Sequence, residues 1–169
     1  TLPDPLYLSL CREAALWGDM VARLLDRGRL EEALRVVAGA SDADLLPLAD
    51  LLVRAGHPRE AHDLVVDRAA SGRDDRPIEW LKDQARASDD PVAERDLAAQ
   101  LFWRQPSLER YQELRELSQR LGRWEQERTE VVERFATEGR YRLLLSIALS
   151  EQDLEAALGY ADAGPLPGD

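Results

Sequence analysis

The sequence is poor in the residues that build disulfide frameworks and metal centres. Cys11 is the only cysteine among 169 residues, which excludes an intrachain disulfide and any site with several cysteine ligands. His57 and His62 are five residues apart, so a helix turns them away from each other, and no acidic partner has matching spacing. A glycine-rich phosphate loop is also missing. We therefore expect no metal site, no cofactor and no catalytic residue in this chain.

Long apolar runs and alternating patterns are missing as well. No run has the length of a signal peptide or a membrane span, so we expect a cytoplasmic protein without membrane contact. No stretch alternates apolar and polar residues for long enough to predict a strand. The hydrophobic fraction of 44% is nevertheless ordinary for a globular chain. These features together predict an all-α fold.

Positive charge is scarce and comes almost entirely from arginine. The formal net charge is −11, and Lys82 is the only lysine, which we interpret as codon bias of a GC-rich genome. An acidic surface is repelled by nucleic acids and by anionic membranes. The acid excess is uneven, because residues 104–142 hold nine arginines and eight acids. That segment is therefore close to neutral.

Apolar residues that recur every three or four positions predict about ten helices along the chain. The first is expected over residues 5–27, weakened in its middle by Gly18. Its predicted apolar face consists of Leu10, Ala14, Trp17, Val21 and Leu24. The helix that begins at Pro91 is expected to bury Val92, Leu97, Ala98, Leu101 and Phe102. Ser41, Asp90, Ser107 and Asp153 each precede an apolar periodic stretch and are typical N-cap residues.

The starts of alternate helices repeat at a nearly constant interval. They fall at Leu30, Pro58, Pro91, Trp124 and Leu154, at intervals of 28, 33, 33 and 30 residues. Such intervals indicate antiparallel helical hairpins stacked as a short α-solenoid. Residues 28–34 (GRLEEAL) resemble the turn between the helices of tetratricopeptide repeats. We expect one helical-repeat domain over 1–163 and a tail rich in Pro and Gly over 164–169; a single helical bundle stays an alternative.

The C-terminal half resembles a known family. Pro106-Ser107, Tyr111, Leu114, Gly122-Arg123-Trp124 and the apolar helix over 143–149 are similar to the helical region of bacterial SWIM zinc-finger proteins. The match covers the last third to half of the chain. The finger itself, Cys-x-Cys followed by Cys-x-His, is absent, so no zinc ligand is carried onto any residue here. The resemblance implies contact with nucleic acid only through a finger outside this chain.

The aromatic residues suggest where a partner would bind. Phe102 and Trp103 are adjacent on one helix, so about 100° separates them and only one fits the apolar face. A partly exposed tryptophan beside an arginine is typical of an interface hot spot. The alternative is that Trp103 packs against the next hairpin. The predicted partner-binding residues are Trp80, Trp103, Arg104, Tyr111 and Arg115.

These features predict a non-catalytic scaffold that mediates protein–protein interaction within a larger intracellular protein. A stack of helical hairpins offers an extended surface that suits a protein or peptide partner. Two other functions stay open. One is a nucleic-acid-associated accessory module of a SWIM zinc-finger protein, and the other is a ligand-sensing helical domain of a regulator.

Overall fold

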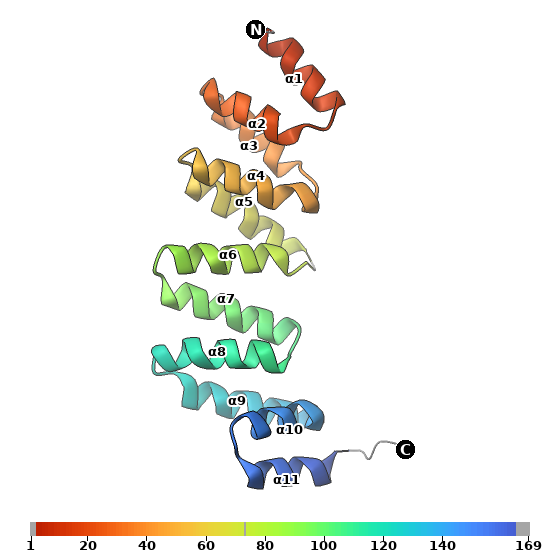
Figure 1. The fold of residues 1–169 in the computed structure, drawn as a ribbon, viewed down its shortest axis with the longest axis vertical. Helices are drawn as coiled ribbons and strands as arrows, with labels where there is room; N and C mark the ends of the chain where they lie inside the picture. The colour runs from red at the N-terminus through yellow and green to blue at the C-terminus, as the bar shows by residue number, and fades with distance from the viewer. Residues whose placement is uncertain (1–2, 73, 165–169) are drawn as a thin grey trace. The chain divides into compact units, whose positions relative to one another are not determined.

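The computed structural model describes residues 3–72 and 74–164 and confirms the all-α fold (Figure 1). These residues form eleven helices, one more than about ten, and contain no strand. Consecutive helices pack antiparallel in sequential hairpins, consistent with a helical-repeat stack. The helices are α1 (Asp4–Glu13), α2 (Trp17–Asp26), α3 (Leu30–Ala38), α4 (Asp42–Arg54), α5 (Pro58–Ser71), α6 (Arg76–Ala87), α7 (Pro91–Arg104), α8 (Leu108–Arg120), α9 (Trp124–Thr137), α10 (Tyr141–Ser150) and α11 (Leu154–Ala163).

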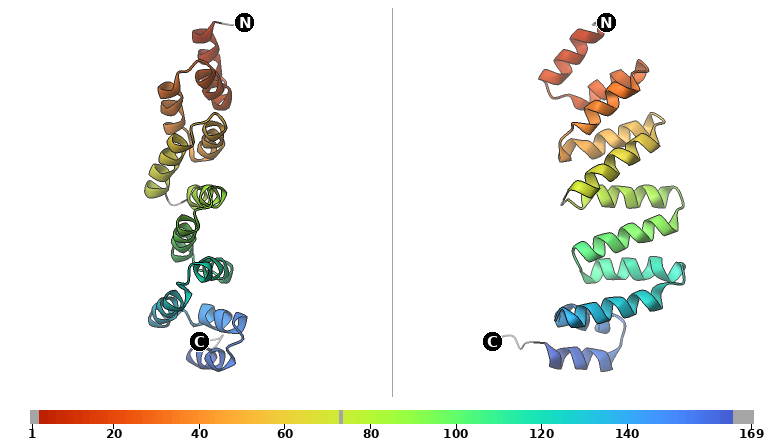
Figure 2. Two further views of the ribbon diagram at one scale, coloured as in Figure 1. Left: turned by 90° about the vertical axis from the view of Figure 1, so that its left-hand side faces the viewer. Right: turned by 180° about the vertical axis from the view of Figure 1, so that it is seen from behind.

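The chain divides into two compact units, Thr1–Leu81 and Lys82–Asp169, and the boundary falls within α6. In the first unit α1 packs on α2, α2 on α3 and α4, and α4 on α5. In the second unit α8 contacts α7, α9 and α10, while α10 also contacts α9 and α11. Figure 2 shows from two further sides that successive helices of each unit are neighbours in space. One domain over 1–163 stays a prediction, and residues 165–169 of the expected tail lie outside the described residues.

The single helix expected over residues 5–27 is wrong, because the chain turns between α1 and α2. Ala15 has a φ of +54°, and the Leu16 N–H donates to the Cys11 carbonyl at 2.8 Å. A left-handed alanine costs roughly 1–2 kcal/mol. The turn lets α1 pack against α2, which one continuous helix would prevent. Leu10, expected on the buried face, is consequently 46% exposed.

One turn geometry joins the two helices of every hairpin. A residue with positive φ follows the first helix, and the next N–H donates at 2.9 Å to the carbonyl five residues earlier. This is the Schellman pattern, which satisfies carbonyls at a helix end. Gly122 adopts the left-handed conformation freely, as the sequence predicts, whereas Gln152 adopts it at φ +61°. The positive-φ residues of the five turns are Gly28, Gly56, Asp89, Gly122 and Gln152.

The predicted helix starts are confirmed by cap geometry. Four side chains accept from the backbone N–H three residues later, at 3.0 to 3.3 Å. Each bond satisfies one of the N–H groups that a helix start leaves without a partner. The capping residues are Ser41, Asp90, Ser107 and Asp153.

The second unit has a core of aromatic and large aliphatic side chains. Phe102 from α7 lies 5.6 Å from Phe135 of α9, measured between ring centroids, and 6.2 Å from Tyr111 of α8. The cluster joins α7, α8, α9 and α10, and its buried members are Phe102, Tyr111, Leu114, Trp124, Val131, Phe135, Leu144 and Ile147. The predicted face of α7 is partly wrong, since Val92 is 43% exposed.

Candidate functional site

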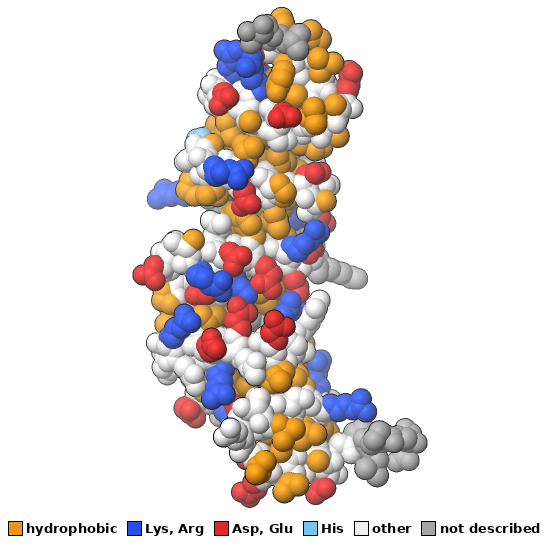
Figure 3. Space-filling model, in the orientation of Figure 1, with side chains coloured by type: hydrophobic (Ala, Val, Ile, Leu, Met, Phe, Trp, Pro, Cys, Tyr) orange, Lys and Arg blue, Asp and Glu red, His pale blue; other side chains and the backbone are white. Residues whose placement is uncertain are grey.

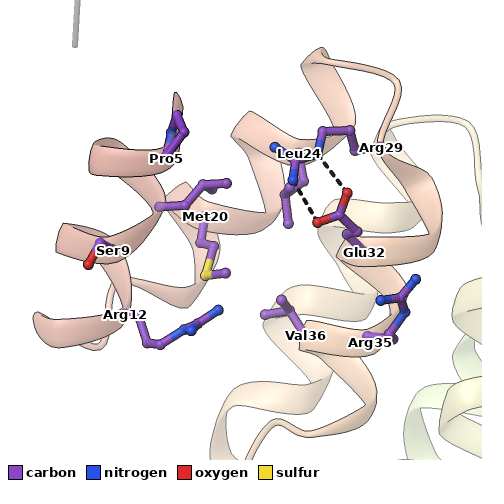
Figure 4. Close-up of a pocket in the computed structure, with 10 residues that line it drawn as sticks. Pro5, Ser9, Arg12, Met20, Leu24, Arg29, Glu32, Arg35 and Val36 are labelled. Carbon is purple, nitrogen blue, oxygen red and sulfur yellow. Dashed lines mark hydrogen bonds and ion pairs between the residues drawn. The ribbon is translucent and has the colours of Figure 1, made fainter. Parts of the chain in front are cut away.

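A groove lies between α1, α2 and α3 in the first unit, with a volume of about 490 Å³ (Figure 4). Its apolar surface comes from one or two residues of each helix, namely Pro5, Leu8, Met20, Leu24 and Val36. Met20 and Leu24 are almost completely buried, so they form the floor rather than the rim. The turn at Ala15 creates this groove, because it places α1 beside α2.

The rim of the groove is charged, and most of its charge is positive. Three arginines and one acid line it: Arg12, Arg29, Arg35 and Glu32. In a chain with a net charge of −11, this is a local excess of two positive charges. Figure 4 shows the Arg12 side chain reaching from α1 towards Val36 on α3. The groove therefore combines an apolar floor with guanidinium groups.

The arginines differ in how firmly they are held. Arg29 donates from Nε and Nη2 to the two carboxylate oxygens of Glu32, at 2.7 and 2.6 Å. This bidentate bond lowers the pKa of Glu32 and raises the pKa of Arg29, so the pair stays ionised. Arg35 lies 3.7 Å from Glu31, with both side chains largely in solvent. Such an exposed pair is weak, which leaves Arg35 available to a ligand.

Trp103 and Arg104 lie at the end of α7 in the second unit. The Trp103 ring is half-buried and packs edge-on against Phe135, with 5.6 Å between centroids. The Arg134 guanidinium carbon lies 4.5 Å from the centre of the Trp103 ring, which is a cation–π distance. Arg104 is exposed. Trp103 of α7 thus packs against α9 of the next hairpin, which is the alternative given for this residue, and a partner site at Trp103 stays a prediction.

Tyr111 is fully buried and belongs to an internal polar network. Its hydroxyl donates to Glu151 at 2.6 Å, and Arg128 donates to the other Glu151 oxygen from Nε at 2.9 Å. Arg115 lines a polar pocket of about 300 Å³ that also includes Arg128 and Glu151. Tyr111 therefore holds the carboxylate of Glu151, which lines this pocket, and Arg115 lines the same pocket.

Trp80 belongs to the first unit, whereas the other four predicted residues belong to the second. It is 9% exposed, and its indole N–H donates to Asp50 at 2.7 Å. Burial of the ring with a satisfied N–H is typical of a tryptophan in a core. The five residues are therefore distributed over both units, and a partner surface composed of them stays a prediction.

We expect Tyr111 to remain un-ionised at a pH where exposed tyrosines titrate. Burial, reinforced by the hydrogen bond to Glu151, raises the pKa of Tyr111 above its ordinary value of about 10. The neutral phenol thus favours the folded state below pH about 10, and this stability is lost as pH rises through the folded pKa. Absorbance at 295 nm should show more tyrosine ionising near pH 10 in denaturant than in the native chain, with contributions from Tyr111 and from Tyr7, whose pKa is also raised by burial.

The Tyr111→Phe variant is the control for this titration. It should leave the native amplitude near pH 10 unchanged and lower the gain on denaturation by one tyrosine, so that only the contribution of Tyr7 remains. A native amplitude that falls by one tyrosine in the variant would contradict the buried position of the hydroxyl.

The groove was not predicted from the sequence. Its lining residues come from α1, α2, α3 and the turn before α3, and the turn at Ala15 that places α1 beside α2 contains no glycine or proline from which it could be predicted.

Among residues 3–72 and 74–164, no group of three or more His, Cys, Asp or Glu side chains is placed to hold a metal ion. Within the same residues, no helix has the length and apolar character needed to cross a bilayer.

Comparison of the chain with protein families, with curated proteins and with solved structures found no match. No family is therefore identified.

Proposed function

We propose that this chain is a non-catalytic, cytoplasmic helical-repeat scaffold that binds a protein partner through the groove between α1, α2 and α3. The observation that carries this proposal is the cationic rim around an apolar floor in an otherwise acidic protein. Helical hairpins form such grooves from side chains of successive helices, and the backbone stays fully hydrogen-bonded. The groove thus offers a contact surface built on rigid elements.

The chemistry of the groove favours a peptide segment that is apolar on one side and acidic on the other. Leu8, Met20 and Val36 offer apolar contact, which a nucleic-acid backbone does not use. Arg12 and Arg35 lie beside this floor and can pair with carboxylates. Charge complementarity therefore selects an acidic, amphipathic peptide as the partner.

The test is binding of two fluorescent 12-residue peptides, measured by anisotropy. One has leucine at every third or fourth position and Asp or Glu elsewhere, and the other has lysine in place of each acid. The acidic peptide should bind the full chain, and its affinity should fall as salt rises. Arg12→Glu should weaken it about tenfold, which corresponds to ~1.4 kcal/mol. Arg59→Glu, an equal charge change on α5, should change it little.

Two outcomes would contradict this proposal. Equal binding of both peptides would show that the arginines do not select the ligand, and equal loss with Arg12→Glu and Arg59→Glu would show that only net charge matters. Binding of a labelled DNA duplex at low salt, without binding of the acidic peptide, would favour the accessory module of a SWIM zinc-finger protein instead.

A further inference from the structure

The pocket that Arg115 lines in the second unit lies between α8, α9 and the turn from α10 to α11. Its volume of about 300 Å³ is at the lower end of the range found for small-molecule sites. Trp124 is the one apolar residue among the described residues that line it. This ring is 6% exposed and packs edge-on against Tyr111, with 5.1 Å between centroids. The pocket thus has one firmly packed aromatic wall and is otherwise polar.

Charged groups of both signs surround this pocket. On the face that Figure 3 views, basic and acidic side chains are interleaved over α7 and α8 rather than separated by sign. The pocket has the same mixed character, because two arginines and three acids line it and give its described lining a net charge of −1. These residues are Arg115, Arg128, Glu125, Glu151 and Asp153.

Three of the five charged side chains are already held by the protein. Arg128 donates from Nε to Glu151 at 2.9 Å, and the Tyr111 hydroxyl donates to the other Glu151 oxygen at 2.6 Å. Asp153 accepts from the Ala156 N–H at 3.1 Å, and its second oxygen lies 3.8 Å from Arg128. These bonds fix one side of the pocket before any ligand binds, which lowers the entropic cost of binding.

Arg115 and Glu125 are the two charged groups that remain. Within residues 3–72 and 74–164, neither the Arg115 guanidinium nor the Glu125 carboxylate forms a hydrogen bond or an ion pair. They come from α8 and α9 and line the same pocket without pairing with each other. A single small molecule that pairs with both must carry a negative group and a positive group.

We propose that this pocket binds a free basic α-amino acid, with its carboxylate on Arg115 and its α-ammonium group on Glu125. A guanidinium group binds a carboxylate through two parallel hydrogen bonds, which also orients the ligand. The positive side chain of L-lysine or L-arginine balances the net negative charge of the lining. Asp153, whose side chain is 41% exposed, is placed to accept from that side chain.

The charges of the pocket disfavour simpler ligands. An inorganic anion or the C-terminus of a peptide would bring a carboxylate or phosphate to Arg115 without an ammonium group for Glu125. A metal cation or an amine would satisfy the acids and leave a positive charge beside Arg115. In each case like charges would lie close together, which is unfavourable. The zwitterion is the ligand class that pairs with both open groups.

The first test compares L-lysine with three analogues by isothermal titration calorimetry of the full, natural chain. L-lysinamide lacks the carboxylate, and Nα-acetyl-L-lysine lacks the α-ammonium group. L-glutamate keeps both groups but carries the opposite side-chain charge. L-lysine should bind, and each analogue should bind about tenfold more weakly or not at all. This comparison needs no variant, so it does not depend on how a mutant folds.

The second test assigns each ligand group to one residue. Arg115→Gln should weaken L-lysine binding about tenfold and abolish the difference between L-lysine and L-lysinamide. Glu125→Gln should abolish the difference between L-lysine and Nα-acetyl-L-lysine. The matched controls are Arg120→Gln and Glu116→Gln, which make the same charge changes at exposed positions of α8 outside the pocket. Both controls should bind L-lysine like the natural chain.

Three results would overturn the proposal. The first is an absence of L-lysine binding to the natural chain. The second is equal binding of L-lysine and L-lysinamide, which would show that the acids attract any cation. The third is an equal loss for Arg115→Gln and Arg120→Gln. Arg12→Glu, which tests the groove of the first unit, should leave L-lysine binding unchanged, so the two proposals can fail separately.

Discussion

Replacing Phe135 by alanine is expected to lower the free energy of unfolding by about 3–5 kcal/mol. Phe135 is 1% exposed and contacts two other rings, at 5.6 Å from Phe102 and 5.6 Å from Trp103 between centroids. The Arg140 guanidinium carbon lies 5.5 Å from its ring centre. Alanine would leave a cavity among side chains from α7, α9 and α10, and helices cannot move inwards without breaking other contacts.

Urea denaturation followed by circular dichroism measures this loss. Phe135→Leu fills most of the volume and should cost less than half as much as Phe135→Ala. Val92→Ala is the matched control, because Val92 is apolar but 43% exposed, and its effect should stay within about 0.5 kcal/mol. Equal losses for Phe135→Ala and Val92→Ala would show that this cluster is not the core of the second unit.

Replacing Glu113 by alanine is expected to cost about 2–3 kcal/mol, the second largest effect. Lys82 donates from Nζ to both Glu113 oxygens, at 2.7 and 2.9 Å, and the lysine side chain is only 7% exposed. Loss of the carboxylate leaves an ammonium group in a site that was built around the opposite charge. Glu113 is 33% exposed, which keeps the expected cost below that of a fully buried pair.

Two variants test whether charge imbalance is the cause. Glu116→Ala removes an exposed acid one turn further along α8 and should change stability by no more than about 0.5 kcal/mol. Lys82→Met with Glu113→Leu removes both charges and should be more stable than Glu113→Ala alone. If the double variant is less stable than Glu113→Ala, the unbalanced charge of Lys82 is not the main cause of the loss. The contact between Lys82 and Glu113 would then itself stabilise the fold.

Lys82, the only lysine, forms a buried ion pair with Glu113, and this role could not be predicted from the scarcity of lysine. The scarcity of lysine was interpreted as codon bias, and that interpretation leaves open why one lysine remains. In the structure Lys82 is buried, and Arg86 lies 3.6 Å from the same carboxylate. An ammonium group is more compact than a guanidinium group, so lysine fits where two cations approach one acid.

The local features of this protein can be predicted from its amino-acid sequence. Ser41, Asp90, Ser107 and Asp153 were recognised as caps because an N-cap bond joins residues only three positions apart. The interval of about 30 residues was recognised because each hairpin repeats the same local signals. The all-α class and the sequential hairpins followed from these short-range relations.

Which residues of different helices face each other depends on how the helices pack, and the sequence pattern does not predict it. The turn at Ala15 depends on packing of α1 against α2 rather than on a turn-forming residue, so the groove beside Arg12 was not predicted. Tyr111 was expected at a surface, but Glu151, forty residues away, supplies its buried hydrogen bond. Burial and pairing across such distances depend on how helices dock, and the periodicity of one helix does not contain that information.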